Sequence, residues 1–271
     1  MKKKSGVLVG VLATVFLYLG ACSIQKEGST KVNDKPAEEL TLYVVRHGKT
    51  MLNTTDRVQG WSDAVLTPEG EKVVMAAGKG LADVEFQSAY SSDSGRAIQT
   101  ADLILAENNK KNVELKTDKR LREFNFGSYE GDLNHTMWQD IADDNGVTLE
   151  EFMKDMSPES FANSVAKLDK EKVEKGANWA AEDYKTITTR LTEGLNEIVK
   201  EESKKNGSGN VLITSHGLSI AALLDTLFDG FEVPEGGLKN SSVSIIKYKD
   251  GKYKLESVND LSYVEKGQKE N

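Results

Sequence analysis

The chain has 271 residues, 38% of them hydrophobic and 29% charged, which is typical of one large globular domain rather than two small ones. Its formal net charge of −8 gives no electrostatic reason to expect a nucleic-acid partner. A single cysteine, Cys22, excludes an intrachain disulfide and a cluster of thiolate metal ligands. We expect no metal and no other cofactor, and no feature of the sequence sets an oligomeric state.

The first residues have the three parts of an export signal. Lysines occupy positions 2–4, a short apolar run covers 7–19, and small residues at 20–21 precede Cys22. The apolar run is short for a membrane-spanning helix. Leu19-Gly20-Ala21-Cys22 resembles the lipobox of bacterial lipoproteins, whose signal peptide is cut before the cysteine.

This resemblance implies that residues 1–21 are a lipoprotein signal peptide and that Cys22 carries the lipid. The alternatives are an ordinary secretory signal or an uncleaved anchor. Residues 22–39 are polar and charged, so we expect a flexible tether between the lipid and the folded domain. The predicted location is the extracytoplasmic face of the cell membrane.

The domain begins with a buried strand that ends in a cation and an imidazole. Residues 42–45 are apolar without interruption, as in a central parallel strand, and Arg46, His47 and Gly48 follow. Ligands of open α/β sheets bind just beyond the carboxyl ends of such strands. These three residues therefore form a candidate binding site.

Alternating helices and strands follow. Thr67 and Pro68 open a predicted helix that ends near residue 82. The next elements are a strand over 86–91, a helix over 95–107 and a weak strand over 113–116.

The second half begins with a change of character. Residues 132–181 carry many charges and scattered aromatic side chains without a strand pattern, so we expect a helical insertion. The elements expected after it are a helix over 182–203, a strand over 211–214, a helix over 218–228 and a hairpin with strands over 242–248 and 253–258.

Strands that alternate with helices predict an α/β fold in three layers, with a mostly parallel central sheet and helices on both faces. We place the domain at residues 40–264, including the insertion at about 132–181, and a polar tail at 265–271.

Two strands end in the same pattern. Arg46-His47-Gly48 follows one, and Ser215-His216-Gly217 follows the other. If the strands are parallel neighbours, the two imidazoles meet at one edge of the sheet. Arg96, in the helix after a third strand, would add a second guanidinium group, and guanidinium groups match phosphate in geometry and charge.

Six stretches of the chain, in order from about residue 41 to 244, resemble the histidine phosphatase superfamily, which includes cofactor-dependent phosphoglycerate mutases. The matching stretches are Arg46-His47-Gly48-Lys49-Thr50 with Asn53; Gln59-Gly60-Trp61; Leu66-Thr67-Pro68-Glu69-Gly70; Ser91-Ser92-Asp93-Ser94-Gly95-Arg96-Ala97-Ile98-Gln99-Thr100-Ala101; Leu121-Arg122-Glu123-Phe124-Asn125-Phe126-Gly127 with Glu130-Gly131; and Ser215-His216-Gly217. Ser94 departs from the pattern, in which an apolar residue is usual. The resemblance implies a six-stranded, phosphoglycerate mutase-like sheet.

The same resemblance implies the role of each matching residue. His47 is the nucleophile that becomes phosphohistidine, and Glu123 is the proton donor and acceptor. Arg46, Arg96 and His216 hold the transferred phosphoryl group. The pocket is also lined by Asn53, Gln59, Gly60 and the backbone of Gly217. An alternative for Arg96 is an ion pair with Asp93 on a helix surface, and His135 is expected to be a surface residue of the insertion.

The function that follows is hydrolysis of a small phosphomonoester outside the cytoplasm, at mildly acid to neutral pH and without sensitivity to chelators. The alternatives are a phosphoglycerate mutase-type phosphotransferase and a lipoprotein that binds a phosphorylated ligand without catalysis. The mutases use additional arginines after the glutamate, and this chain has no arginine between Arg122 and Arg190.

Overall fold

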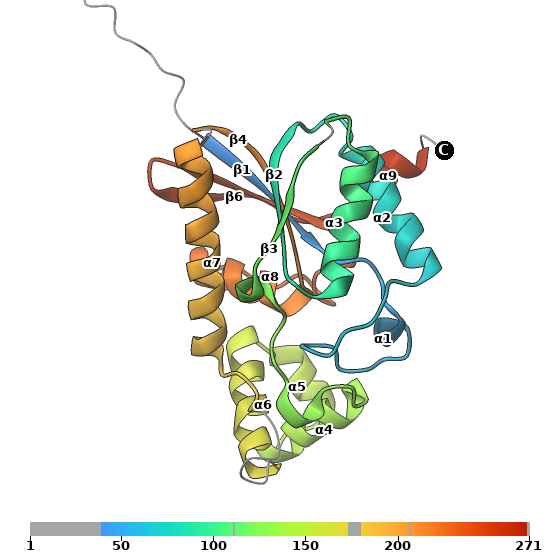
Figure 1. The fold of residues 1–271 in the computed structure, drawn as a ribbon. Coiled ribbons are helices and arrows are strands. Elements are labelled where there is room, and N and C mark those ends of the chain that lie inside the picture. The colour runs from blue at the N-terminus through green and yellow to red at the C-terminus, as the bar shows by residue number, and fades with distance from the viewer. Residues whose placement is uncertain (1–38, 111, 173–179, 206, 270–271) are drawn as a thin grey trace, which may run out of the picture. The chain divides into compact units, whose positions relative to one another are not determined.

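A six-stranded sheet organises the domain (Figure 1). Its strands, in sheet order, are β3 (Leu115–Thr117), β2 (Phe86–Ser91), β4 (Gly209–Ser215), β1 (Glu39–Arg46), β5 (Val243–Lys249) and β6 (Lys252–Asp260). The first four run parallel, whereas β5 is antiparallel to β1 and β6 is antiparallel to β5. The predicted mostly parallel α/β sheet is confirmed.

The computed structural model describes residues 39–110, 112–172, 180–205 and 207–269. The predicted signal peptide, the candidate lipid site Cys22 and all of the predicted tether except Glu39 lie outside these residues. In the part of the chain that is described, no helix combines the length and the hydrophobicity needed to cross a membrane.

Helices cover both faces of the sheet because its strands are apolar on both sides. In β1, Leu42 and Val44 belong to one buried cluster, whereas Val45 belongs to a second one. The first cluster includes residues of α7 (Tyr184–Lys205) and α8 (Gly217–Leu227). The second includes residues of α2 (Pro68–Gly80) and α3 (Gly95–Glu107), which lie together on the other face (Figure 1). The expected three layers are therefore present.

The insertion is helical, as predicted. It contains α4 (Asn134–Asn145), α5 (Leu149–Asp155) and α6 (Pro158–Lys172). Thr148 and Glu151 form a reciprocal capping box at the start of α5, which satisfies two free N–H groups there. Phe152 and Phe161 of these helices belong to the same buried cluster as α7 and α8, so the insertion shares the core of the domain.

The polar segment expected as a tail is in part a helix. Helix α9 (Ser262–Lys269) packs on α2, and glycines allow their close approach. A Cβ on Gly267 would lie 1.9 Å from the Ala76 carbonyl oxygen, and one on Gly80 would lie 2.0 Å from the Tyr263 carbonyl oxygen. Residues 265–269 therefore belong to the folded domain, and the expected tail is corrected to that extent. The segment is short and mostly polar, so its helix depends on contacts with α2, a helix far away in the chain.

Candidate active site

The residues after the parallel strands meet at one edge of the sheet. Strands β1 and β4 pair in parallel with Arg46 opposite Ser215, so His47 and His216 follow at the same level. Their ring centroids lie 5.3 Å apart, and the expected meeting of the two imidazoles is confirmed. Strands β2 and β3 lie on the other side of β4 and end toward the same edge of the sheet. In the chain, Arg96 comes after β2 and Glu123 comes after β3.

His47 is buried, and its hydrogen bond determines which ring nitrogen holds the proton. The Nδ1 atom lies 2.8 Å from the Gly48 carbonyl oxygen, which can only accept. Nδ1 therefore carries the proton, and Nε2 keeps its lone pair. Burial and the positive charges of Arg96 and Arg46 lower the pKa of His47 well below its ordinary value. The ring is therefore a neutral imidazole with a nucleophilic nitrogen.

His216 precedes the first turn of α8 and is fully buried. Neither of its ring nitrogens has a hydrogen-bond partner among the described residues. Burial, Arg96 and His47 lower the pKa of His216 well below its ordinary value. Two neutral imidazoles thus lie beside two cationic guanidinium groups.

Arg46 turns back over the start of α8. Its Nη1 donates to the carbonyl of Leu238, whereas its buried Nε has no partner among the described residues. A Cβ on Gly217 would lie 3.1 Å from this Nε. The expected lining residue Gly217 is therefore a glycine at which the guanidinium group approaches the backbone closely.

Arg96 is fully buried and holds the loop over residues 59–63. It donates to the carbonyls of Gly60 and Ser62 at 2.8 and 3.1 Å, and it pairs with the Asp63 carboxylate at 2.8 Å. The alternative pairing of Arg96 with Asp93 is wrong, because Asp93 forms a two-bond ion pair with Arg122. The Nε of Arg96 is left without a partner in the described part of the chain.

The predicted amide residues lie in a polar network behind His47. Thr50 Oγ1 donates to Gln59 Oε1 at 2.6 Å, and Thr50 N–H donates to Asn53 Oδ1 at 3.2 Å. Asn240, which the sequence did not suggest, donates to the His47 carbonyl at 2.9 Å. These bonds use the carbonyl oxygens of both amides and leave buried Gln59 Nε2 without an acceptor among the described residues. Gln59 therefore presents a donor.

Gly60 lies in a loop whose backbone binds a carboxylate. Successive N–H groups of Gly60, Trp61 and Ser62 donate to Glu130 at 2.8–3.1 Å, and the N–H of Phe126 adds a fourth bond. A Cβ on Gly60 would lie 2.1 Å from the Phe124 carbonyl oxygen. The geometry gives Gly60 a role in holding the loop, with its N–H directed to Glu130.

Replacement of Glu130 by glutamine is expected to destabilise the protein by about 2 kcal/mol. One carboxylate oxygen becomes an amide NH₂ that faces backbone N–H groups, so at least one donor loses its acceptor. Urea unfolding measures the change. The matched control is Glu69→Gln, at an exposed side chain of α2, with an effect below about 0.5 kcal/mol. Equal stability of the two variants would contradict this role of Glu130.

Glu123 is buried, and its carboxylate is bound by the first turn of α8. Oε2 accepts from the N–H of Leu218 at 3.1 Å, and Oε1 accepts from the N–H of Ser219 at 2.8 Å. The positive end of the helix dipole also favours a negatively charged carboxylate at this position. Glu123 is thereby bound to the helix that follows His216. Burial lowers the pKa of Arg46, and the charge of Glu123 opposes that shift.

The backbone at Glu123 is also held by two side chains, Arg190 and Trp61, whose roles the sequence did not suggest. Arg190 of α7 donates to the Glu123 carbonyl at 2.8 Å and also to the carbonyls of Arg120 and Arg122. Trp61 Nε1 donates to the Glu123 carbonyl at 3.1 Å. These bonds hold the segment that carries the Glu123 carboxylate.

His135 lies exposed on α4, outside the site, as the sequence predicted.

The two lowered imidazole pKa values predict a loss of stability in mild acid. An unfolded imidazole titrates near pH 6.5, so below that pH the unfolded chain binds more protons than the folded one. The free energy of unfolding should fall by up to about 1.4 kcal/mol per pH unit for each imidazole as the pH drops below about 6.5. Urea titrations between about pH 5 and 7 test the slope.

The slope should flatten in a His47→Gln/His216→Gln variant and persist in His135→Gln. A slope unchanged in the double variant would show that other groups cause it.

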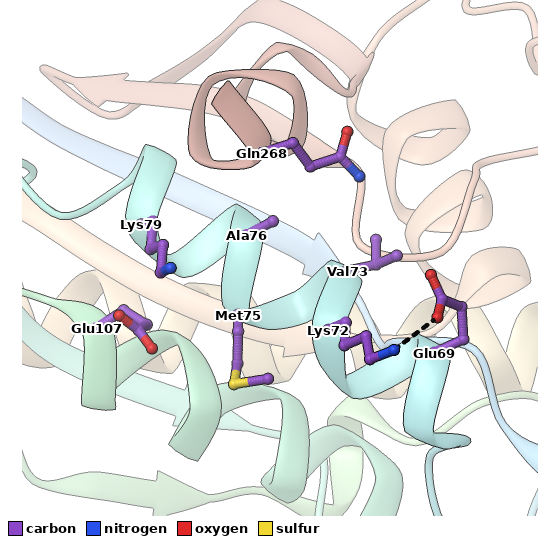
Figure 2. Close-up of a pocket in the computed structure, with 8 residues that line it drawn as sticks. All are labelled: Glu69, Lys72, Val73, Met75, Ala76, Lys79, Glu107 and Gln268. Atoms are coloured by element: carbon purple, nitrogen blue, oxygen red, sulfur yellow. Dashed lines mark hydrogen bonds and ion pairs between the residues drawn. The ribbon is translucent and has the colours of Figure 1, made fainter. Parts of the chain in front are cut away.

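A surface hollow of about 270 Å³ lies away from these residues, where α2, α3 and α9 meet (Figure 2). Its lining is Glu69, Lys72, Val73, Met75, Ala76, Lys79, Glu107 and Gln268. None of the candidate site residues lines it. In the described part of the chain, no group of three or more histidine, cysteine or acidic side chains is placed to hold a metal ion.

A parallel α/β sheet that gathers two neutral imidazoles, two arginines and a buried carboxylate at its carboxyl edge defines an enzyme of the phosphoryl-transfer type. The chain belongs to the histidine phosphatase superfamily, branch 1, whose family model matches residues 42–261.

Relatives with different reactions in their names are similar to it. A crystal structure of a phosphoglycerate mutase from Bacillus anthracis is 41% identical, with 86% of this chain and 98% of that chain covered and a TM-score of 0.77. A broad-specificity phosphatase of Saccharomyces cerevisiae is 29% identical, over 79% of this chain and 82% of its own length. A 2,3-bisphosphoglycerate-dependent phosphoglycerate mutase of Caulobacter vibrioides is 29% identical, over 72% of this chain and 86% of its own length.

Proposed function

We propose that the protein hydrolyses a small phosphomonoester through a phosphohistidine formed on His47. The observation that carries this proposal is a group of buried nitrogen atoms without partners. Among the described residues, ten buried side-chain nitrogen or oxygen atoms lack a hydrogen bond, and five belong to this site: Arg46 Nε, Gln59 Nε2, Arg96 Nε and both ring nitrogens of His216. A phosphoryl group has enough acceptor oxygens to satisfy at once the free N–H groups of Arg46, Gln59 and Arg96 and the single N–H of the neutral His216 ring.

In the first step, Nε2 of His47 attacks phosphorus and the bond to the ester oxygen breaks. The leaving oxygen takes a proton from the carboxylic acid of Glu123. The proton on His47 Nδ1 stays there and remains hydrogen-bonded to the Gly48 carbonyl, which stabilises the positive charge that forms on the ring. The guanidinium groups of Arg46 and Arg96 stabilise charge on the phosphoryl oxygens in the transition state.

In the second step, water attacks the phosphorus of the phosphohistidine. The Glu123 carboxylate takes a proton from that water, the bond to Nε2 breaks, and its electron pair returns to the imidazole. Inorganic phosphate leaves, and Glu123 is protonated again for the next cycle.

The test is a screen of phosphomonoesters with the domain from Glu39 onward, with and without a chelator, and with release of inorganic phosphate as the readout. We expect hydrolysis at mildly acid to neutral pH and the same rate with the chelator, because no step above needs a metal. A protein that binds the esters without releasing phosphate, or that stops when a chelator is added, would contradict the proposal.

A mutase is the second candidate, favoured by the similarity to the Bacillus anthracis protein named a phosphoglycerate mutase. Against it, the chain has no arginine between Arg122 and Arg190, and Arg190 is engaged by backbone carbonyls and by Glu182. Incubation with 3-phosphoglycerate separates the two: a hydrolase releases inorganic phosphate, whereas a mutase moves the phosphoryl group to the neighbouring hydroxyl.

We also propose that the protein is exported and held by a lipid on Cys22 at the extracytoplasmic face of the membrane. The support is the sequence of the first 22 residues, with its basic start, short apolar run and Leu19-Gly20-Ala21-Cys22. Labelled fatty acid should be incorporated into the wild-type protein in bacterial cells and not into Cys22→Ala. Label in both proteins would contradict lipidation at this cysteine.

A further inference from the structure

Ser219 is a fully buried serine in the first turn of α8, and its hydroxyl touches two acceptors. Its Oγ lies 2.8 Å from the Arg122 carbonyl oxygen and 2.9 Å from Glu123 Oε1. A hydroxyl has one proton, so it can donate fully to only one of them at a time. The two acceptors are therefore alternatives between which a rotation of the hydroxyl chooses.

The two oxygens of Glu123 are held unequally. Oε1 lies within hydrogen-bond distance of the Ser219 N–H, the Ser219 hydroxyl and the Phe124 N–H, at 2.8–3.1 Å. Oε2 accepts one bond among the described residues, from the Leu218 N–H. Oε2 thus has a lone pair to spare, and it is the oxygen suited to carry the transferable proton.

The charge of Glu123 decides which acceptor is the stronger. A carboxylate is a stronger acceptor than a peptide carbonyl, whereas the Oε1 of a carboxylic acid protonated on Oε2 is a weaker acceptor than a carboxylate. The hydroxyl of Ser219 is therefore expected to face Glu123 when Glu123 is ionised and Arg122 when Glu123 is protonated.

We propose that Ser219 is a positioning residue that stabilises the ionised form of Glu123 by turning its hydroxyl from the Arg122 carbonyl to Oε1 when Glu123 gives up its proton. This inference rests on the proposed function, in which Glu123 donates a proton from Oε2 to the leaving oxygen. The Ser219 proton stays on Oγ throughout, and no bond to it breaks. The residue therefore stabilises the carboxylate that remains after the proton has been transferred.

The test is the pH profile of kcat/KM for hydrolysis of phenyl phosphate, whose alkaline limb reports loss of the proton from the essential acid. Without the hydroxyl, the carboxylate of Glu123 loses one of its hydrogen bonds, which favours the protonated form. We expect the alkaline limb of Ser219→Ala to move up by about one pH unit. Ser219→Cys, with a weak donor of similar size, should give an intermediate shift.

The matched control is Ser215→Ala. The Ser215 hydroxyl is also buried and donates to a carbonyl of the same segment, Leu121, at 2.9 Å, but no bond joins it to the Glu123 carboxylate. Its loss can lower the rate, and the alkaline limb should stay at the wild-type position. Ser219 and Ser215 thus differ in the one contact that matters.

Two outcomes overturn the inference in distinguishable ways. If the wild-type protein releases phosphate and the limbs of Ser219→Ala and Ser219→Cys coincide with its own, the hydroxyl has only a structural role and the proposed function stands. If the wild-type protein hydrolyses no phosphomonoester, the proposed function fails and the role of Ser219 falls with it.

Discussion

Replacement of His47 by alanine is expected to lower phosphatase turnover by at least about 10⁴-fold and to abolish the phosphorylated enzyme. Nε2 of His47 has the lone pair that the proposed attack on phosphorus needs, because the bond from Nδ1 to the Gly48 carbonyl keeps Nε2 unprotonated. The measurement is twofold: steady-state release of phosphate, and trapping of acid-labile radiolabel on the protein after brief exposure to labelled substrate.

His135→Ala is the matched control, because this histidine lies exposed on α4 outside the site. It should keep both the turnover and the label. Unfolding curves establish that the His47 variant is folded. Label or turnover that survives in folded His47→Ala would end the proposal of a nucleophile at this position.

Replacement of Glu123 by glutamine should lower kcat for an alkyl phosphate by about 10²- to 10⁴-fold. Glutamine has no proton to give to the leaving oxygen and cannot take one from water. With p-nitrophenyl phosphate the first step needs little help, because the leaving oxygen is stable as an anion. The rate of phosphoenzyme formation, measured by rapid mixing, should therefore fall much less with this ester.

The comparison of the two esters distinguishes proton transfer from a loss of structure. A disturbed site would slow both esters by the same factor, and that result would contradict the role of Glu123 as an acid. Glu69→Gln, at an exposed position, should leave both rates at the wild-type level.

Most of the helices and strands that position the site were predicted correctly from the sequence. The helix Gly95–Glu107 has the limits that were expected, since its apolar spacing is a local pattern. His47 and His216 could be placed together because a parallel pairing of two strands with the same ending allows little else. Helix α9 was missed, because a mostly polar segment of eight residues gives a weak local signal and its contacts come from α2.

The partners of the charged side chains could not be predicted. Asp93, three positions before Arg96, was the alternative partner suggested by proximity in sequence, yet Arg96 pairs with Asp63 and Asp93 with Arg122. Glu130 belonged to a matching stretch, but nothing in its neighbours indicates that its carboxylate is bound by the backbone of residues 60–62. Ion pairs and hydrogen bonds act over a few ångströms, so they depend on loop positions that no local pattern encodes.

The sequence by itself determined the α/β alternation, the strand endings and the residue types at the site, because apolar periodicity and helix caps are properties of neighbouring residues. The tertiary structure alone decided the protonation of His47 Nδ1 and the binding of Glu123 by the first turn of α8. It also decided which buried donors have no partner among the described residues. Those features arise where segments as distant as Glu123 and Ser219 touch, and the strength of each contact depends on burial and geometry that exist only in the folded chain.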